Sequence, residues 1–316
     1  MMAPPEKKVS LMIRGAGYLL VALSLAYLAY KLSQIGLMGL SQFLNGKALA
    51  VLSGLVILYS LMNLLLASNW MRLVRMLSRD AAVPKPLYRI YLQSVTAKYL
   101  PGNIFHIAGR HLLARDLPVP QATLLRANAA EILFIMSAAG LILLATLGES
   151  TPAVIRYMRD RAGLLKTGAL ILIPLAGILL YGFRHTVKRE AGIFFGRGNR
   201  MDLMLSMAFY GLFFLFTSLI LKGVLWLQIP AGFSAPASSL NLLHAFTLAW
   251  MAGFVIPGAP GGMGVREALL LLMLAPFCGE PAALASSLLL RVITVLGDVL
   301  AFFYSLVLQR REKKIL

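Results

Sequence analysis

Long apolar runs constrain this chain more than any other feature. Residues 48–70 and 203–221 contain no charged side chain, and residues 132–148 are equally apolar. An uncharged apolar run of about 18 residues or more is typical of a transmembrane helix, because about 20 residues cross the hydrocarbon core. The chain is 59% hydrophobic and 13% charged, whereas a soluble domain is about half apolar and about a quarter charged. The sequence therefore predicts an all-α integral membrane protein, and no stretch resembles a separate soluble domain.

The charge balance is strongly basic, with 30 Lys and Arg against 12 Asp and Glu. Nucleic-acid binding is one explanation, but no compact basic domain exists to carry it. Cytoplasmic loops of membrane proteins also collect Lys and Arg, and we favour this explanation. Cys278 is the only cysteine, so an intramolecular disulfide is excluded and a thiolate metal site is not expected. The first apolar segment continues beyond Ala26, which favours a retained helix over a cleaved signal peptide.

The basic clusters predict an orientation in the membrane. If the N-terminus is cytoplasmic, the clusters that follow the second and fifth spans, and the cluster at the C-terminus, all lie inside. The uncharged 229–240 loop then lies outside, while the basic residues near 156–166 fit this orientation badly. We expect both termini in the cytoplasm and the chain in the cytoplasmic (inner) membrane. The predicted segments are 13–36, 47–69, a broken segment 87–115, 124–147, 165–183, 203–228, a broken segment 241–276, and 282–308.

Each broken segment contains a Pro-Gly turn between two apolar halves, namely Pro101-Gly102 and Pro257-Gly258. Proline lacks an amide N–H and glycine permits a backbone reversal, so a continuous helix is not expected there. Each half is too short to cross the membrane. The sequence therefore predicts two re-entrant hairpins, near 87–115 and 241–276. The alternative is a pair of ordinary helices joined by a surface loop.

The two halves of the chain share one architecture. Pro101 and Pro257 lie 156 residues apart, and so do Arg110 and Arg266. Residues 1–158 and 159–316 each contain three predicted transmembrane helices and one hairpin. Three crossings invert the second half relative to the first, and inverted repeats with broken helices place a substrate site near the bilayer midplane. We predict one membrane domain, 1–316, built from these two inverted repeats.

Ionisable residues inside the apolar segments are the candidate site residues, because each needs a partner or a cavity. Arg266 follows a glycine-rich turn at the start of a half-helix, where free N–H groups and the helix dipole favour an anion. Asn103 is a candidate N-cap in the first hairpin, and His106 and Arg110 share a face after it. Arg291, Thr294 and Asp298 lie on one helix face. An alternative role for the arginines is pairing with Glu131, Glu267 and Asp298.

Catalytic and metal-binding patterns are missing from the sequence. His106 and His111 do not share a helix face, and no His/Glu pair has zinc spacing. The nucleotide-binding spacings and the G-x-S-x-G elbow are also absent. We expect no enzyme activity, no cofactor and no metal.

The motifs "KYLPGNIFHIAGR" and "VIPGAPGGMGVREALLLLML" resemble the two signature motifs of the flippase-like family typified by the membrane domain of lysylphosphatidylglycerol synthases. Leu100, between Tyr99 and Pro101, departs from that pattern. The resemblance implies movement of a lipid or lipid-linked headgroup between leaflets, without the synthase activity. It carries over Lys98, Tyr99, Pro101, Gly102, Arg110, Pro257, Gly261, Gly262, Gly264, Arg266 and Glu267, with Glu131 and Arg291 as supporting residues.

Three functions remain open. The first is a transporter for an anionic lipid or a polyprenyl-phosphate carrier, with an anion site between the hairpins. The second is a non-transporting scaffold or partner subunit of an envelope-biosynthesis enzyme, and the third is a membrane-embedded transferase. A homodimer is a further candidate assembly, and nucleic acid is not expected as a partner.

Overall fold

The computed structural model describes residues 46–78, 83–99, 104–159, 200–228, 238–256 and 260–315. All regular secondary structure in these ranges is helical. The predicted spans 13–36 and 165–183 lie outside the described residues. So do five of the predicted site residues, which belong to the two predicted Pro-Gly turns: Pro101, Gly102, Asn103, Pro257 and Gly258.

Four described helices are long and apolar enough to cross a membrane. They are α2 (Gly46–Leu77), α5 (Gln121–Arg159), α7 (Arg200–Trp226) and α9 (Val265–Ile315). The first three coincide with the predicted spans 47–69, 124–147 and 203–228. The prediction of an all-α protein with long apolar helices is confirmed, as expected for an integral membrane protein.

The segment predicted as the first hairpin is broken. It consists of α3 (Pro86–Ser94), the 3-10 helix η2 (Val95–Tyr99) and α4 (Phe105–Leu113). The two α-helices pack against each other, and a Cβ atom added at Gly109 of α4 would lie 3.6 Å from the Cβ of Ser94 in α3. With nine residues, α4 is about 14 Å long, less than half of a bilayer core of about 30 Å.

The second hairpin consists of α8 (Ser239–Val255), the 3-10 helix η3 (Pro260–Gly262) and the first part of α9. The Ser238 side chain caps α8 by accepting a hydrogen bond from the Asn241 N–H at 3.1 Å. The turn before α9 uses positive φ angles at Gly261, Gly262 and Gly264, of 56°, 76° and 80°. Residues with a side chain rarely adopt such angles, which is the physical reason for the glycines in this turn.

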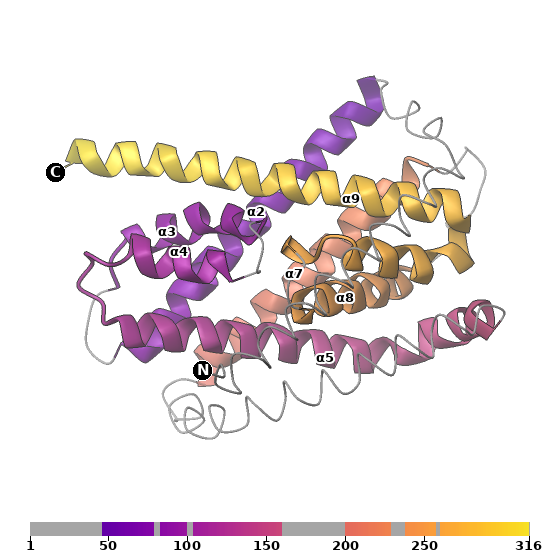
Figure 1. The fold of residues 1–316 in the computed structure, drawn as a ribbon, viewed down its shortest axis with the longest axis horizontal. Helices are drawn as coiled ribbons and strands as arrows, with labels where there is room; N and C mark the ends of the chain where they lie inside the picture. Colours follow the sequence, from indigo (N-terminus) through magenta and orange to yellow (C-terminus); the bar gives the residue numbers. More distant parts are fainter. Residues whose placement is uncertain are drawn as a thin grey trace, which may run out of the picture.

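A sharp break divides α9 into two helical parts, residues 265–278 and 280–315. Gly279 has φ 80° and ψ 158°, which is not helical, and it lies between Pro276 and Pro281. The chain therefore reverses direction, and the second part runs back along the molecule to the C-terminus (Figure 1). This break separates the predicted hairpin 241–276 from the predicted span 282–308.

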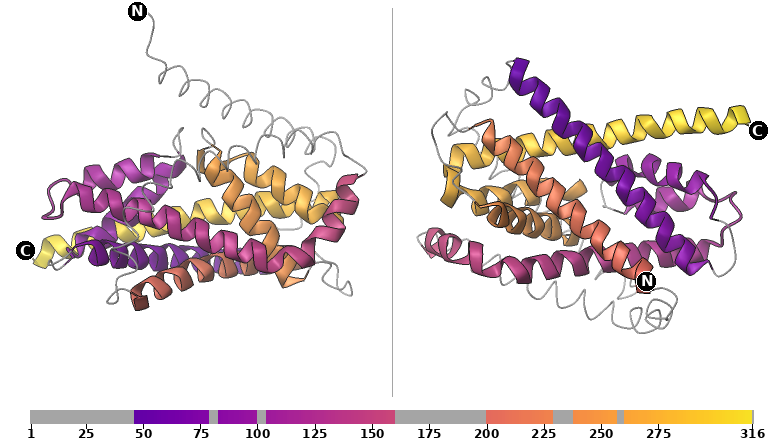
Figure 2. Two further views of the ribbon diagram at one scale, coloured as in Figure 1. Left: turned by 90° about the horizontal axis from the view of Figure 1, so that it is seen from below. Right: turned by 180° about the vertical axis from the view of Figure 1, so that it is seen from behind.

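Two close approaches position the hairpins within the bundle. Near the tips, η2 contacts η3, and a Cβ atom at Gly261 would lie 3.1 Å from the ring of Tyr99. The second part of α9 crosses α2, where a Cβ atom at Gly297 would lie 2.7 Å from Cδ1 of Tyr59. The helices α2 and α7 lie side by side and α9 crosses them (Figure 2). The breaks of the two hairpins thus meet inside a frame of long helices.

Gly297→Ala is expected to destabilise the protein, because the added methyl group would collide with Tyr59 and with the backbone of α2. Overpacking of this kind costs about 1–3 kcal/mol. Thermal unfolding of the purified protein in one detergent measures the change. The control is Gly211→Ala in α7, where no described atom lies within 4 Å of the added Cβ. The control should leave the stability unchanged or raise it by up to about 1 kcal/mol, since alanine is the better helix former. Equal melting temperatures for the two variants would contradict the close crossing.

Candidate functional site

Arg110 is buried, and its guanidinium contacts polar side chains of the protein. It is 2% exposed, its Nη1 donates to Oδ1 of Asn128 at 2.9 Å, and the same nitrogen pairs with the Glu131 carboxylate. The Tyr91 hydroxyl donates to the other oxygen of Glu131 at 2.8 Å. The guanidinium carbon of Arg110 lies 3.9 Å from the centroid of the Tyr91 ring. These contacts join α3, α4 and α5, and we call these four residues the Arg110 cluster.

Further polar side chains surround the Arg110 cluster. The Trp70 indole donates to Oδ1 of Asn128 at 2.9 Å, and Nδ2 of Asn128 lies 3.2 Å from Nε2 of His111. His106 lies one turn before Arg110, and its buried Nδ1 has no hydrogen-bond partner among the described residues. Among the described residues, Arg110 pairs with Glu131 whereas the guanidinium of Arg266 lies beside Trp250. The expected pairing of Arg110 with Glu131 is therefore present, whereas a single site containing both arginines is not seen in the described contacts.

The second buried acid, Asp298, is neutralised by Lys98. Asp298 is 0% exposed, and Nζ of Lys98 lies 2.8 Å from its Oδ2. The Tyr99 hydroxyl donates to the same oxygen, and Nδ2 of Asn63 donates to Oδ1 at 3.0 Å. The sequence suggested that an arginine would balance this acid, and the structure assigns that role to a lysine in the first hairpin. These contacts connect α2, η2 and α9.

The third acid, Glu267, serves two groups. Its Oε2 accepts the backbone N–H of Gly264 at 2.7 Å, and its Oε1 lies 3.7 Å from Nε of Arg291. Nη1 of Arg291 in turn donates to the carbonyl of Gly261 at 2.9 Å. A glutamate in the first turn that reaches back to the start of its helix is a capping arrangement. Glu267 therefore occupies part of the helix N-terminus that the sequence analysis assigned to a bound anion, and its other oxygen faces Arg291.

Arg266 has no carboxylate partner among the described residues. Its guanidinium lies 5.4 Å from the centroid of the Trp250 ring, and its buried Nε makes no hydrogen bond within the described part of the chain. The Arg266 side chain passes close to two glycines. A Cβ atom added at Gly253 would lie 2.5 Å from Arg266 Cγ, and one added at Gly262 would lie 2.6 Å from Arg266 Nε. The backbone of the hairpin thus leaves room for this one side chain.

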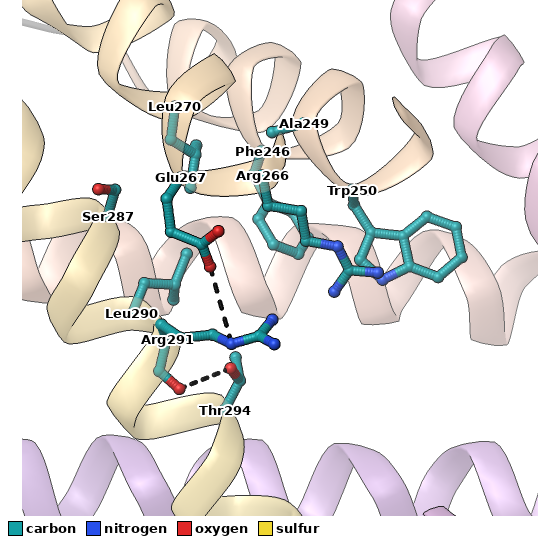
Figure 3. Close-up of a pocket in the computed structure, with 10 residues that line it drawn as sticks. All are labelled: Phe246, Ala249, Trp250, Arg266, Glu267, Leu270, Ser287, Leu290, Arg291 and Thr294. Atoms are coloured by element: carbon teal, nitrogen blue, oxygen red, sulfur yellow. Dashed lines mark hydrogen bonds and ion pairs between the residues drawn. The ribbon is translucent and has the colours of Figure 1, made fainter. Parts of the chain in front are cut away.

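A small pocket lies beside Arg266, between α8 and the two parts of α9 (Figure 3). It offers about 20 Å³ to the centres of water-sized molecules, enough for about one water. Figure 3 shows the guanidinium groups of Arg266 and Arg291 on the same side of this space, with the Glu267 carboxylate next to Arg291. The residues that line the pocket are Phe246, Ala249, Trp250, Arg266, Glu267, Leu270, Ser287, Leu290, Arg291 and Thr294.

The described charges leave one cation in surplus at this pocket. Arg110 pairs with Glu131, Lys98 with Asp298, and Arg291 with Glu267. The Thr294 hydroxyl is used within its own helix, where it donates to the Arg291 carbonyl at 2.9 Å. An ionised side chain in apolar surroundings attracts a counter-ion strongly, because the local dielectric is low. A bound anion would therefore balance the charge of Arg266.

Several residues of the site were not identified from the sequence. Asn63 and Asn128 were visible as polar residues within apolar spans, and this signal could have marked them as partners of buried charges. Trp250 and Phe246 gave no such signal, because aromatic residues are common throughout these helices. Their position beside the arginine depends on the packing of α8 against α9.

Arg110→Gln is expected to lower stability by about 3–5 kcal/mol, because it leaves the Glu131 carboxylate in the bundle without its positive partner. The matched control is Arg72→Gln. Arg72 pairs with Asp202 at 2.7 Å, but the two side chains are 27% and 40% exposed, so this change should cost about 0–1 kcal/mol. Denaturation in a single detergent compares the two variants. Similar losses for both would show that Arg110 does not hold the hairpin in place.

Comparison of the sequence with protein-family models gave no match, and comparison with curated proteins also gave no match. The resemblance of the two Pro-Gly motifs to the flippase-like family therefore stays a prediction.

Proposed function

We propose that this protein binds the anionic headgroup of a lipid in the Arg266 pocket and moves the lipid between membrane leaflets. One observation carries the proposal: the half-buried Arg266 has no carboxylate partner among the described residues, and a guanidinium is charged at neutral pH. Arg291 also lines this pocket, and the Glu267 carboxylate near its Nε at 3.7 Å is shared with the cap of α9. Two neighbouring guanidinium groups with one carboxylate favour the binding of a further negative group.

Phosphate is the anion that best fits this pair. A guanidinium presents several N–H donors in one plane, and it binds phosphate oxygens through two parallel hydrogen bonds. The rest of the lining suits the apolar portion of a lipid, because Phe246, Trp250, Leu270 and Leu290 contribute hydrocarbon surface. A lipid phosphate combines both chemistries. Phospholipids and polyprenyl-phosphate carriers are therefore the candidate cargoes.

The architecture we propose for this function is a pair of inverted repeats, 1–158 and 159–316, each with a re-entrant hairpin. Two features support it. The helices α3 and α4 of the first hairpin have nine residues each, and the two hairpins contact each other through η2 and η3. Irregular backbone at membrane depth requires surrounding protein or a water-filled cavity. The polar residues at the breaks, Lys98 and Arg291 among them, provide such surroundings.

The small size of the pocket favours a second candidate, a non-transporting scaffold or partner subunit of an envelope enzyme. A space that holds about one water does not hold a phosphate group. Transport therefore requires α8 and the two parts of α9 to separate, and the break at Gly279 is a suitable hinge between those parts. A scaffold would keep the pocket closed and would use Arg266 only for contact with a partner.

Arg266→Gln should weaken the binding of anionic lipid about tenfold or more and slow lipid movement, while the protein stays folded. The fold should survive because the change removes a charge that has no described carboxylate partner. The control is Lys222→Gln, which also removes one positive charge. Lys222 lies outside the pocket and donates to Ser239 at an exposed position.

Lipid binding is measured on the purified variants, and lipid movement after reconstitution into liposomes with labelled phospholipids and polyprenyl phosphates. Binding that persists in Arg266→Gln would overturn the anion site. Binding without stimulated movement of any lipid would favour the scaffold.

The proposed orientation predicts that a cysteine at position 234 can be labelled from outside intact cells. Ser234 belongs to the uncharged segment 229–240, which the sequence predicts as an external loop, and it lies outside the described residues. The background variant is Cys278→Ser, which removes the only native cysteine. Labelling with a membrane-impermeant maleimide should occur without permeabilisation. Labelling that occurs only in permeabilised cells would contradict the proposed orientation and would indicate that both termini lie outside.

A further inference from the structure

We propose that Glu267 sets the charge of the anion that the Arg266 pocket accepts, so that the pocket prefers a singly charged phosphodiester to a doubly charged phosphate monoester. This inference rests on the proposed function and deepens it. It distinguishes two cargoes left open above, because the phosphate of a common phospholipid headgroup is a diester and that of a polyprenyl phosphate is a monoester.

The charged lining of the pocket consists of two arginines and one glutamate, which gives a net charge of +1. Among the described residues, Lys98 and Asp298 form a further charged pair near the pocket, and because they lie 2.8 Å apart their charges cancel. They adjoin the pocket through Tyr99, whose ring centroid lies 5.3 Å from the guanidinium carbon of Arg291. A bound anion with one negative charge would therefore leave the site neutral.

Glu267 is held where it limits the charge of the ligand. It is 5% exposed, and its Oε2 is fixed at 2.7 Å from the backbone nitrogen of Gly264. Its Oε1 lies 3.7 Å from Nε of Arg291, so an anion that reaches Arg291 comes close to this carboxylate. Figure 3 shows that the carboxylate and both guanidinium groups border one space.

The apolar lining amplifies the effect of a second negative charge. A first negative charge balances the surplus of Arg266, but a second would face Glu267 without compensation. Charges repel more strongly where the dielectric is low, and the pocket is bordered by Phe246, Trp250, Leu270 and Leu290. A phosphodiester carries one charge, whereas a phosphate monoester has a second pKa of about 6 and carries nearly two charges at pH 8. The pocket should therefore discriminate by charge.

The test compares two lipids that differ by one methyl group. The full chain is purified in an uncharged detergent at pH 8 and titrated calorimetrically with dihexanoyl phosphatidylmethanol, a diester, and with dihexanoyl phosphatidic acid, a monoester. The native protein should bind the diester about tenfold more tightly or better. Glu267→Gln raises the pocket charge to +2 and should shift the affinity ratio about tenfold or more toward the monoester. The control Asp202→Asn removes one negative charge outside the pocket and should leave the ratio unchanged.

A double variant separates charge from positioning. Arg266→Gln with Glu267→Gln returns the pocket to a net charge of +1, so the preference for the diester should return at lower affinity. A purely structural role for Glu267 predicts no such return. Should Glu267→Gln fail to fold, Arg266→Gln alone decides, because a pocket of zero net charge must weaken monoester binding more than diester binding.

Two results would overturn the inference in distinguishable ways. If Glu267→Gln weakens both lipids equally and the ratio stays constant, Glu267 only positions Arg291, and the proposed function survives. If the native protein binds neither lipid, or if Arg266→Gln leaves binding of both unchanged, the anion site itself fails and the inference fails with it.

Discussion

The placement of the hairpins depends on the need of each buried ionised side chain for a partner. An unpaired charge in the bilayer interior costs about 2.5 kcal/mol or more, so each buried acid requires a cation nearby. The structure meets this need with contacts between separate elements. Glu131 of α5 pairs with Arg110 of α4, and Asp298 of α9 pairs with Lys98 of η2. One half of the first hairpin is thereby attached to α5, and the other half is attached to α9.

The second hairpin depends on space as well as on charge. Arg266 passes Gly253 of α8 and Gly262 of the turn at distances that a methyl group would not allow. The positive φ angles of the turn bring Glu267 back to the N–H of Gly264, and the carbonyl of Gly261 accepts from Arg291. Each of these glycines is thus favoured for a physical reason, which is either a positive φ angle or the close approach of another side chain. The ion pair of Glu267 and Arg291 then connects the two parts of α9 across the break at Gly279.

Much of this architecture could be predicted because it depends on local sequence patterns. Long apolar runs indicated α2, α5 and α7, and the Pro-Gly turns indicated the breaks. The spacing of Arg291, Thr294 and Asp298 predicted one shared helix face, and in the structure Arg291 contacts the second hairpin while Asp298 contacts the first. The partner of Asp298 could not be predicted, because Lys98 and Asp298 are 200 residues apart and each of several cations satisfied the charge count equally. Pairing among like candidates is decided by tertiary packing, which a single sequence does not specify.

The surplus charge of Arg266 bears on how a lipid headgroup could cross the membrane interior. A charged complex moves through a low-dielectric region at a high cost, whereas a neutral complex does not. An empty pocket with a net charge of +1 needs solvation, and its small volume is enough for about one water. Once α8 and the two parts of α9 have separated, a bound phosphodiester would replace that water and neutralise the site. The loaded pocket would then be the state that most easily changes its exposure from one leaflet to the other. The carboxylate of Glu267, fixed by the Gly264 N–H, would limit the ligand to the charge that makes this state neutral.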